Sequence, residues 1–99
     1  LQIAENILKE NVLKGFPGIE FISKKVGVSP TKLKSDFKVI YNSSVYKHYS
    51  KLQMILAKRI IKSKKYNIKE TATLLGYTNA SKFASAFRDF HGKLPSDYI

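Results

Sequence analysis

The chain has 99 residues, which fits one small domain and leaves too little apolar material for two ordinary cores. Its 43% hydrophobic and 25% charged residues are typical of a folded domain, and the absence of cysteine excludes disulfides and thiolate metal sites. The formal net charge of +11 favours an anionic partner such as nucleic acid or an acidic membrane surface. No apolar run reaches the roughly 20 residues of a membrane span, and the start lacks a signal peptide's layout. Because the first residue is Leu1 and not Met, we expect a fragment of a longer protein.

The first stretch with helical spacing of apolar residues runs up to "KGFPG", whose glycines and proline end a helix. Its inward face is expected to consist of Ile3, Ile7, Leu8 and Val12. A second helix is predicted from about Ile19 to Val26. It stops at Gly27, where a left-handed backbone conformation suits glycine.

A third helix begins after this glycine turn, with Ser29 as its N-cap and Pro30 at its first helical position. Apolar residues follow at helical spacing: Leu33, Phe37, and Ile40 or Tyr41. Two short helices joined by a tight turn predict a helix-turn-helix motif, and we take residues 1–43 as a first subdomain.

Residues 44–64 contain no glycine or proline and predict one long amphipathic helix. Its inward positions are expected to be Val45, Tyr49, Leu52, Ile55 or Leu56, Arg59 with its apolar neighbours, and Ile60 or Ile61. About 20 residues at 1.5 Å each span roughly 30 Å, close to the roughly 34–36 Å between successive major grooves on one face of DNA. This helix is therefore expected to link two DNA-reading units.

Residues 65–99 repeat the pattern of the first subdomain. A short helix carries Ile68, Ala72 and Leu75 and stops at Gly76. The next helix is expected to turn Phe83, Phe87 and Phe90 to one face, with Gly92 closing it and Pro95 opening a last turn. Matching pairs are Ile19 and Ile68, Val26 and Leu75, Gly27 and Gly76, Leu33 and Phe83, Phe37 and Phe87, and Lys38 and Arg88. The sequence thus predicts an all-α fold of about seven helices, with two helix-turn-helix subdomains joined by a long linker helix.

The stretch "IKETATLLGYTNASKFASAFRDFHGKLPSDY" resembles the signature of the C-terminal DNA-binding domain of AraC/XylS-type transcriptional regulators, and the resemblance covers essentially the whole chain. The signature places are filled by Ile68, Ala72, Gly76, Tyr77, Phe83, Phe87, Gly92, Pro95 and Tyr98. Thr71 stands where a branched apolar residue is usual, Ser23 where alanine is common, and Ile99 where arginine often follows. We expect the first two to loosen local packing without altering the fold.

The resemblance implies that residues 1–99 form a single AraC-type DNA-binding domain of a bacterial, cytoplasmic transcriptional regulator, typically an activator. It implies double-stranded promoter DNA and RNA polymerase as partners, with the second helix of each motif in the major groove. It also implies a missing N-terminal region that senses a ligand, dimerises or receives a signal.

The second helix of each motif is called its reading helix here. With Leu33 and Phe37 turned inward, the opposite face of the first reading helix presents Thr31, Lys32, Lys34, Ser35 and Lys38. The positions that the family uses for base contacts fall on Thr31, Lys34 and Ser35, whose side chains can donate to guanine, give or accept one hydrogen bond, or touch a thymine methyl. Contacts to phosphate are expected from Ser29, Lys32 and Lys38.

The second reading helix offers short side chains in the matching places, Ser81, Ala84 and Ser85, of which the two serines are expected to contact bases. Its expected phosphate contacts are Asn79, Lys82 and Arg88. We therefore expect the first unit to carry most direct readout, and the second to add phosphate anchoring and a preference for DNA shape.

The remaining titratable residues give no sign of catalysis. His48 is expected on the surface of the long helix, and His91 at a helix end, where its charged form favours the local dipole. Asp36 and Asp89 are expected to be surface or intersubdomain charge partners. We expect no catalytic residue, no metal ligand and no cofactor.

Three other classes of function fit the sequence less well than DNA binding. A basic amphipathic helix such as residues 44–64 could lie on anionic lipid or bind an acidic protein, but the aromatic residues sit at core spacing in both copies. An enzyme would need a nucleophile, a histidine–carboxylate pair, a Walker loop or a metal cluster, and no such motif occurs. An RNA binder would more often expose aromatic side chains for stacking. Double-stranded DNA is the expected partner, and a membrane is not.

Overall fold

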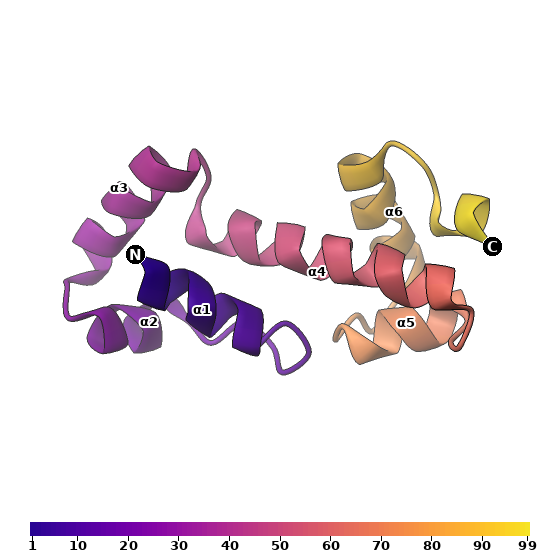
Figure 1. Cartoon of the computed structure of the whole chain (residues 1–99), viewed down its shortest axis with the longest axis horizontal. Helices are drawn as coiled ribbons and strands as arrows, with labels where there is room; N and C mark the ends of the chain where they lie inside the picture. Colours follow the sequence, from indigo (N-terminus) through magenta and orange to yellow (C-terminus); the bar gives the residue numbers. More distant parts are fainter. The chain divides into compact units, whose positions relative to one another are not determined.

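The computed structural model describes residues 1–99 as an all-helical chain without strands, which confirms the predicted fold class (Figure 1). Its elements are α1 (Gln2–Glu10), α2 (Ile19–Val26), α3 (Pro30–Tyr41), α4 (Val45–Ser63), α5 (Ile68–Leu74), α6 (Ala80–His91) and the short 3₁₀ helix η1 (Pro95–Tyr98). The pairs α2–α3 and α5–α6 are the two expected helix-turn-helix motifs.

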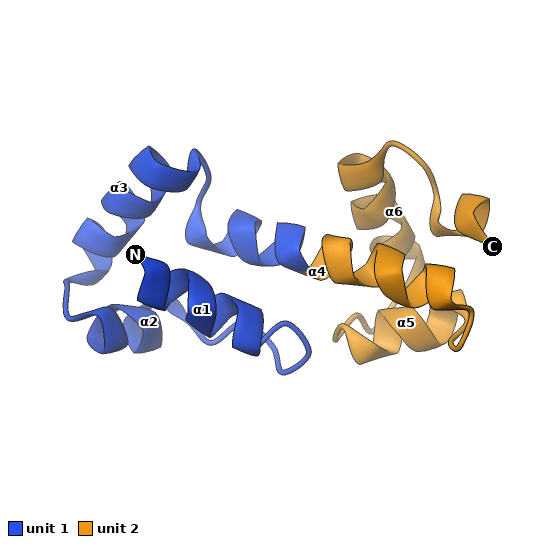
Figure 2. Cartoon of the chain, in the orientation of Figure 1, with its two compact units in different colours: residues 1–52 blue, residues 53–99 orange.

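The chain forms two compact units, Leu1–Leu52 and Gln53–Ile99 (Figure 2). The boundary between them falls inside α4, so residues 45–52 of this helix belong to the first unit and residues 53–63 to the second. Both parts bury side chains in the core of their own unit. The long helix is therefore a structural part of both units as well as the connection between them.

The core of the first unit is built from α1, α2, α3 and the start of α4. Its buried residues are Ala4, Leu8, Ile22, Leu33, Phe37, Val45 and Tyr49. The expectation for Ile3 was wrong, because this side chain is 55% exposed. The buried stripe of α1 runs through Ala4 and Leu8, four residues apart, and the small Ala4 side chain allows the helix to approach its neighbours closely.

The core of the second unit contains Met54, Ala57, Ile61, Ala72, Leu75, Phe83 and Phe87. Phe83 and Phe87 are fully buried as predicted, but Phe90 is 40% exposed, so its inward placement was wrong. The space beyond Phe87 is filled by His91, whose ring centroid lies 4.4 Å from that of Phe87. Phe90 consequently lies at the edge of the core, as does Ile40 at the matching place of α3, which is 61% exposed.

The buried face of α4 includes polar side chains that the apolar pattern did not reveal. Gln53 is buried and donates from Nε2 to the carbonyl oxygen of Leu75 at 2.9 Å, which satisfies the end of α5. Ile55, in contrast, is 46% exposed, so of the two alternatives only Leu56 contacts the core. Arg59 is exposed, and Ile61, not Ile60, is the buried member of its pair.

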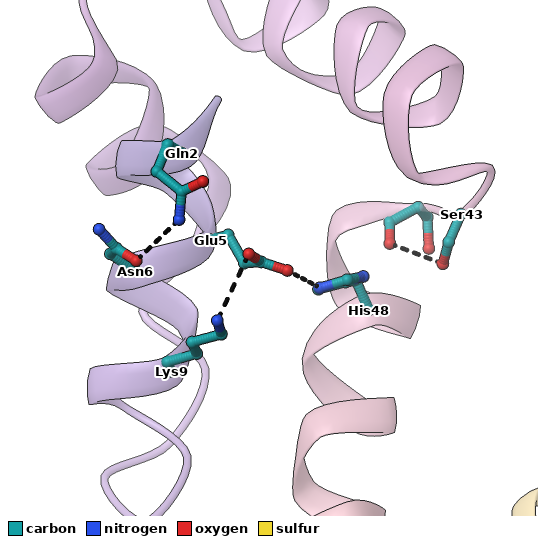
Figure 3. A network of polar contacts seen from close by, with 7 residues as sticks. Gln2, Glu5, Asn6, Lys9, Ser43 and His48 are labelled. Carbon is teal, nitrogen blue, oxygen red and sulfur yellow. Dashed lines mark hydrogen bonds and ion pairs between the residues drawn. The ribbon is translucent and has the colours of Figure 1, made fainter.

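His48 was expected on the surface and is instead almost buried, at 8% exposure. Its Nε2 lies 3.0 Å from Oε2 of Glu5, whose other carboxylate oxygen is 3.5 Å from Lys9 Nζ (Figure 3). The pair connects α1 to α4 across the first unit. Burial raises the pKa of the Tyr41 phenol, and the negative charge of the Glu5 carboxylate raises it further. The ring centroid of Tyr41 lies 4.8 Å from that of His48.

Each unit places three rings side by side at the same repeat positions. In the first unit these are Phe37, Tyr41 and His48, and in the second they are Phe87, His91 and Tyr98. Histidine and tyrosine have thus exchanged places between the copies. Each histidine also finds an oxygen on a neighbouring helix: His91, the last residue of α6, bonds through Nε2 to the carbonyl oxygen of Met54 at 2.8 Å.

Local signals in the sequence account for the helix ends. Gly27 and Gly76 both have φ of +87°, a left-handed conformation that glycine adopts without steric cost. The Ser29 hydroxyl accepts from the Lys32 backbone N–H at 3.1 Å, as expected for an N-cap. The two polar departures from the family pattern are buried and hydrogen-bonded, Ser23 to the carbonyl of Glu20 at 3.0 Å and Thr71 to that of Asn67 at 2.8 Å.

Replacing Glu5 by alanine is expected to destabilise the chain by about 1–3 kcal/mol, because the His48 ring would lose its buried acceptor. Urea denaturation followed by circular dichroism measures this change in the free energy of unfolding. Glu10→Ala on the exposed end of the same helix is the matched control and should change stability by less than about 0.5 kcal/mol. Equal effects of the two substitutions would contradict a structural role for the Glu5–His48 pair.

Phe87→Ala is expected to cost about 3–5 kcal/mol through loss of burial and creation of a cavity. Phe90→Ala removes the same side chain from the same helix at the edge of the core, and its cost should be below about 2 kcal/mol. Thermal and urea unfolding of both variants would check the assignment of the inward face. A larger loss for Phe90→Ala would show that this face is misassigned.

Candidate nucleic-acid interface

The first helix-turn-helix presents a polar stripe on the outer side of α3. Leu33 and Phe37 are fully buried and fix the rotation of the helix about its axis. Thr31, Lys34 and Ser35, predicted to contact bases, are all exposed on the other side. The structure brings these three together at spacings of three and four residues, the separation of neighbours on one helix face.

The second helix-turn-helix repeats this arrangement with shorter side chains. Phe83 and Phe87 face the core, and Ser81 and Ser85 are exposed four residues apart on α6. Ala84, which lies between them, is half-buried. The outer face of α6 therefore offers two hydroxyls where α3 offers two hydroxyls and an ammonium.

The residues predicted to contact phosphate are all exposed: Ser29, Lys32, Lys38, Asn79, Lys82 and Arg88. Two of them already have a structural task. Ser29 caps α3, and Asn79 caps α6 by accepting from the backbone N–H groups of Ser81 and Lys82 at 2.7 and 3.2 Å. The capping oxygens hold the first turn of each reading helix, so a phosphate contact would use the remaining hydroxyl proton of Ser29 or the amide protons of Asn79.

Lys32 has an ionic partner that the sequence reasoning did not assign to it. Its Nζ lies 3.1 Å from Oδ2 of Asp36, one turn further along α3. The spacing of four residues and the opposite charges were the signal that could have revealed this pair. Asp36 is therefore a surface charge partner within its own helix.

An apolar residue on the outer stripe of α3 was also missed. Val39 is 80% exposed and follows Thr31 and Ser35 at successive intervals of four, so it continues their stripe. The matching place in α6 is occupied by the exposed Asp89. The two reading helices thus differ in chemistry in the middle of the stripe, where Lys34 matches Ala84, and at its C-terminal end, where Val39 matches Asp89.

No three side chains of His, Asp or Glu gather where they could hold a metal ion. None of the helices is both long enough and apolar enough to cross a membrane. The outer faces of the two helix-turn-helix motifs are the surfaces on which the predicted residues come together.

Comparisons with known proteins agree with this geometry. A family model described as a helix-turn-helix domain matches residues 22–99. The msm operon regulatory protein of Streptococcus mutans is 26% identical over 77 residues, covering 78% of this chain and 28% of that protein. The HTH-type transcriptional regulator GbdR of Pseudomonas aeruginosa is 29% identical over 72 residues, which cover 73% of this chain and 20% of the length of GbdR. The chain thus spans less than a third of the length of these curated relatives.

Solved structures share the fold over almost the whole chain. A transcriptional regulator of Chromobacterium violaceum with an AraC-type DNA-binding domain matches with a TM-score of 0.92 and 21% identity, covering 99% of this chain and 87% of that one. The C-terminal domain of AraT, a response regulator of Geobacillus stearothermophilus, matches with a TM-score of 0.85 and 24% identity, covering 98% and 80%. The chain belongs to the AraC-type helix-turn-helix family of transcriptional regulator domains.

Asp36→Asn is expected to strengthen binding to duplex DNA up to about fivefold at low salt, because it releases Lys32 and removes a carboxylate from the reading helix. Fluorescence anisotropy with a labelled duplex measures the dissociation constant. Glu10→Gln makes the same change in net charge on α1, outside both motifs, and should have a smaller effect. If the two variants gain affinity equally, only the overall charge matters and the ion pair does not restrain Lys32.

Proposed function

We propose that the chain is the DNA-binding output domain of a bacterial transcriptional regulator and binds double-stranded promoter DNA through both helix-turn-helix units, in successive major grooves. The observation that carries the proposal is the duplicated reading helix. In each copy a pair of buried apolar residues four apart turns a polar stripe outward, on a chain of net charge +11.

In the first unit, direct readout is assigned to Thr31, Lys34 and Ser35. The Lys34 ammonium donates to guanine O6 or N7, and the two hydroxyls exchange single hydrogen bonds with base edges. Val39, further along the stripe, is suited to van der Waals contact with a thymine methyl. Ser29, Lys32 and Lys38 contact phosphates beside the groove and fix the register of the helix.

The second unit has a different balance of contacts. Ser81 and Ser85 reach bases only by short hydroxyl side chains, whereas Lys82 and Arg88 carry charge on long ones. Together with Asn79 they anchor α6 on phosphates, and specificity there comes more from DNA shape than from hydrogen bonds to bases.

The full-length protein is proposed to contain a further N-terminal region that senses a ligand, dimerises or receives a signal, and to act on RNA polymerase in the cytoplasm. The share of the curated relatives that the chain covers, 20–28%, supports the presence of such a region. The chain itself acts by binding and not by catalysis.

A salt titration of DNA binding tests the proposal. The chain is mixed with duplex DNA from upstream of its own gene, and with a scrambled duplex of equal length. Tighter binding to the natural duplex, with a log–log slope of roughly −4 to −7 for about five to seven neutralised phosphates, is the expected result. Failure to bind either duplex would reject the proposed function.

The division of labour between the units is tested by substituting one reading residue in each. Lys34→Ala is expected to cost roughly 1–3 kcal/mol of discrimination at one base position, because it removes the only long donor of the first stripe. Ser85→Ala should cost less. Binding-site selection from a randomised duplex library, compared with wild type, gives the base preference at each position. Equal relaxation by both variants would contradict the assignment of most direct readout to the first unit.

A further inference from the structure

One continuous part of the chain carries positive charge without any carboxylate. Residues 37–69 contain nine of the 18 lysines and arginines and no aspartate or glutamate. Three of these lysines are close in sequence in the second unit: Lys64 and Lys65 in the turn after α4, and Lys69 in the first turn of α5. These three residues are called the α5 lysine cluster below, and the predicted DNA contacts do not include them.

The α5 lysine cluster is free to meet an anion. All three side chains are exposed, and none of them forms an ion pair. The nearest carboxylate in sequence, that of Glu70, accepts from the Asn67 backbone N–H at 2.9 Å, while Asn67 Oδ1 accepts from the Glu70 N–H at 2.7 Å. This capping box holds the carboxylate against the helix backbone, and Glu70 forms no ion pair with the lysines.

Lys64 occupies a backbone conformation that favours glycine. Its φ is +62°, and besides Asn42 it is the one residue other than glycine with a positive φ. A glycine would remove the steric cost of this turn, and the chain keeps a lysine there. A strained backbone position occupied by a charged side chain favours a role for the charge itself.

The first unit has no such cluster. Counting back 49 residues, the separation of the two copies before their turns, Lys64, Lys65 and Lys69 correspond to Gly15, Phe16 and Glu20. A lysine cluster at the start of the first motif helix is therefore present in the second unit and not at the matching place of the first. The second unit is the one whose reading helix carries only short side chains in the base-contact places.

We propose that the α5 lysine cluster binds the DNA phosphate backbone beside the groove that α6 enters, and so supplies much of the affinity of the second unit. The proposal rests on the proposed function. In a helix-turn-helix the first helix crosses the backbone next to the groove occupied by the second, and α5 is the first helix of this motif. Lysines before and within its first turn lie where phosphates pass, and they bind without regard to sequence.

The test compares two double variants with equal net charge in a salt titration with the natural and the scrambled duplex. Lys65→Gln with Lys69→Gln removes two charges from the cluster. Lys14→Gln with Lys51→Gln removes two from exposed, unpaired lysines of the first unit, outside both motifs. Circular dichroism establishes that both variants are folded.

The cluster variant is expected to lose about 10–60-fold in affinity at 0.1 M salt for both duplexes, with a salt slope smaller by about 1.8 and an unchanged ratio between the duplexes. The control should lose less than about threefold. Equal losses in the two variants would overturn the proposal, because only the net charge would matter. If wild type binds neither duplex, the proposed function fails and this inference fails with it.

Lys64→Gly separates a structural from an electrostatic role. The substitution relieves the positive φ, so the thermal midpoint should rise or stay constant. Affinity for both duplexes should nevertheless fall about eightfold at 0.1 M salt, as expected for the loss of one phosphate contact. Unchanged or tighter binding by this variant would exclude Lys64 from the phosphate-binding surface.

Discussion

The inward anchoring of the reading helices is the constraint on which the functional surface depends. Phe37 on α3 and Phe87 on α6 are fully buried, each with a second buried apolar residue four positions earlier. Such a pair fixes the rotation of a helix, because turning it would expose an aromatic ring and open a cavity, at a cost of several kcal/mol. The outer stripe is thereby held in one orientation without any hydrogen bond of its own. Its residues are free to vary for recognition, since the fold does not require them.

The second constraint is electrostatic. A net charge of +11 on 99 residues opposes compaction, and three of the seven Asp and Glu side chains make hydrogen bonds that hold the structure together. Glu5 bonds to His48, Glu70 closes the capping box at the start of α5, and Asp97 accepts from the Leu94 backbone N–H at 3.0 Å. Negative charge thus serves the fold, while positive charge remains available on the surface. A polyanion would relieve the repulsion, so folding and binding favour each other.

Local rules predicted most of the fold because its helix ends carry strong signals. Gly27, the Ser29–Pro30 pair and Gly76 determine where helices stop and start through backbone sterics and capping, which need no tertiary information.

The errors arose where packing decides. Ile3 and Phe90 have the right spacing for a core and lie at its edge, because nearby side chains, Ala4 and His91, occupy the inward place. His48 and Gln53 are polar and yet buried, since each has a hydrogen-bond partner on a segment distant in sequence. Such partners cannot be found from periodicity. The exposure of the outer stripe could be predicted more fully, because the stripe is the face opposite a buried apolar pair, Leu33 and Phe37 on α3 and Phe83 and Phe87 on α6. Val39 was missed because apolar residues at helical spacing are usually read as core.

The comparison of the two copies shows which features folding requires and which it leaves free. The three-ring cluster is kept in both units even though tyrosine and histidine have exchanged places, so the requirement is for aromatic volume beside Phe37 and Phe87, with an oxygen within reach of each histidine.

Outside the core the copies diverge: Lys34 faces outward on α3 where α6 has the half-buried Ala84, and Val39 corresponds to Asp89. A duplicated scaffold with unlike outer faces cannot bind the same DNA sequence equally well with both units. The short side chains of α6 limit what it can gain from base edges, so any comparable affinity in the second unit has to come from charge near the reading helix. The exposed lysines at the start of α5 provide that charge under the proposal made above, in which the first unit selects the site and the second holds the duplex.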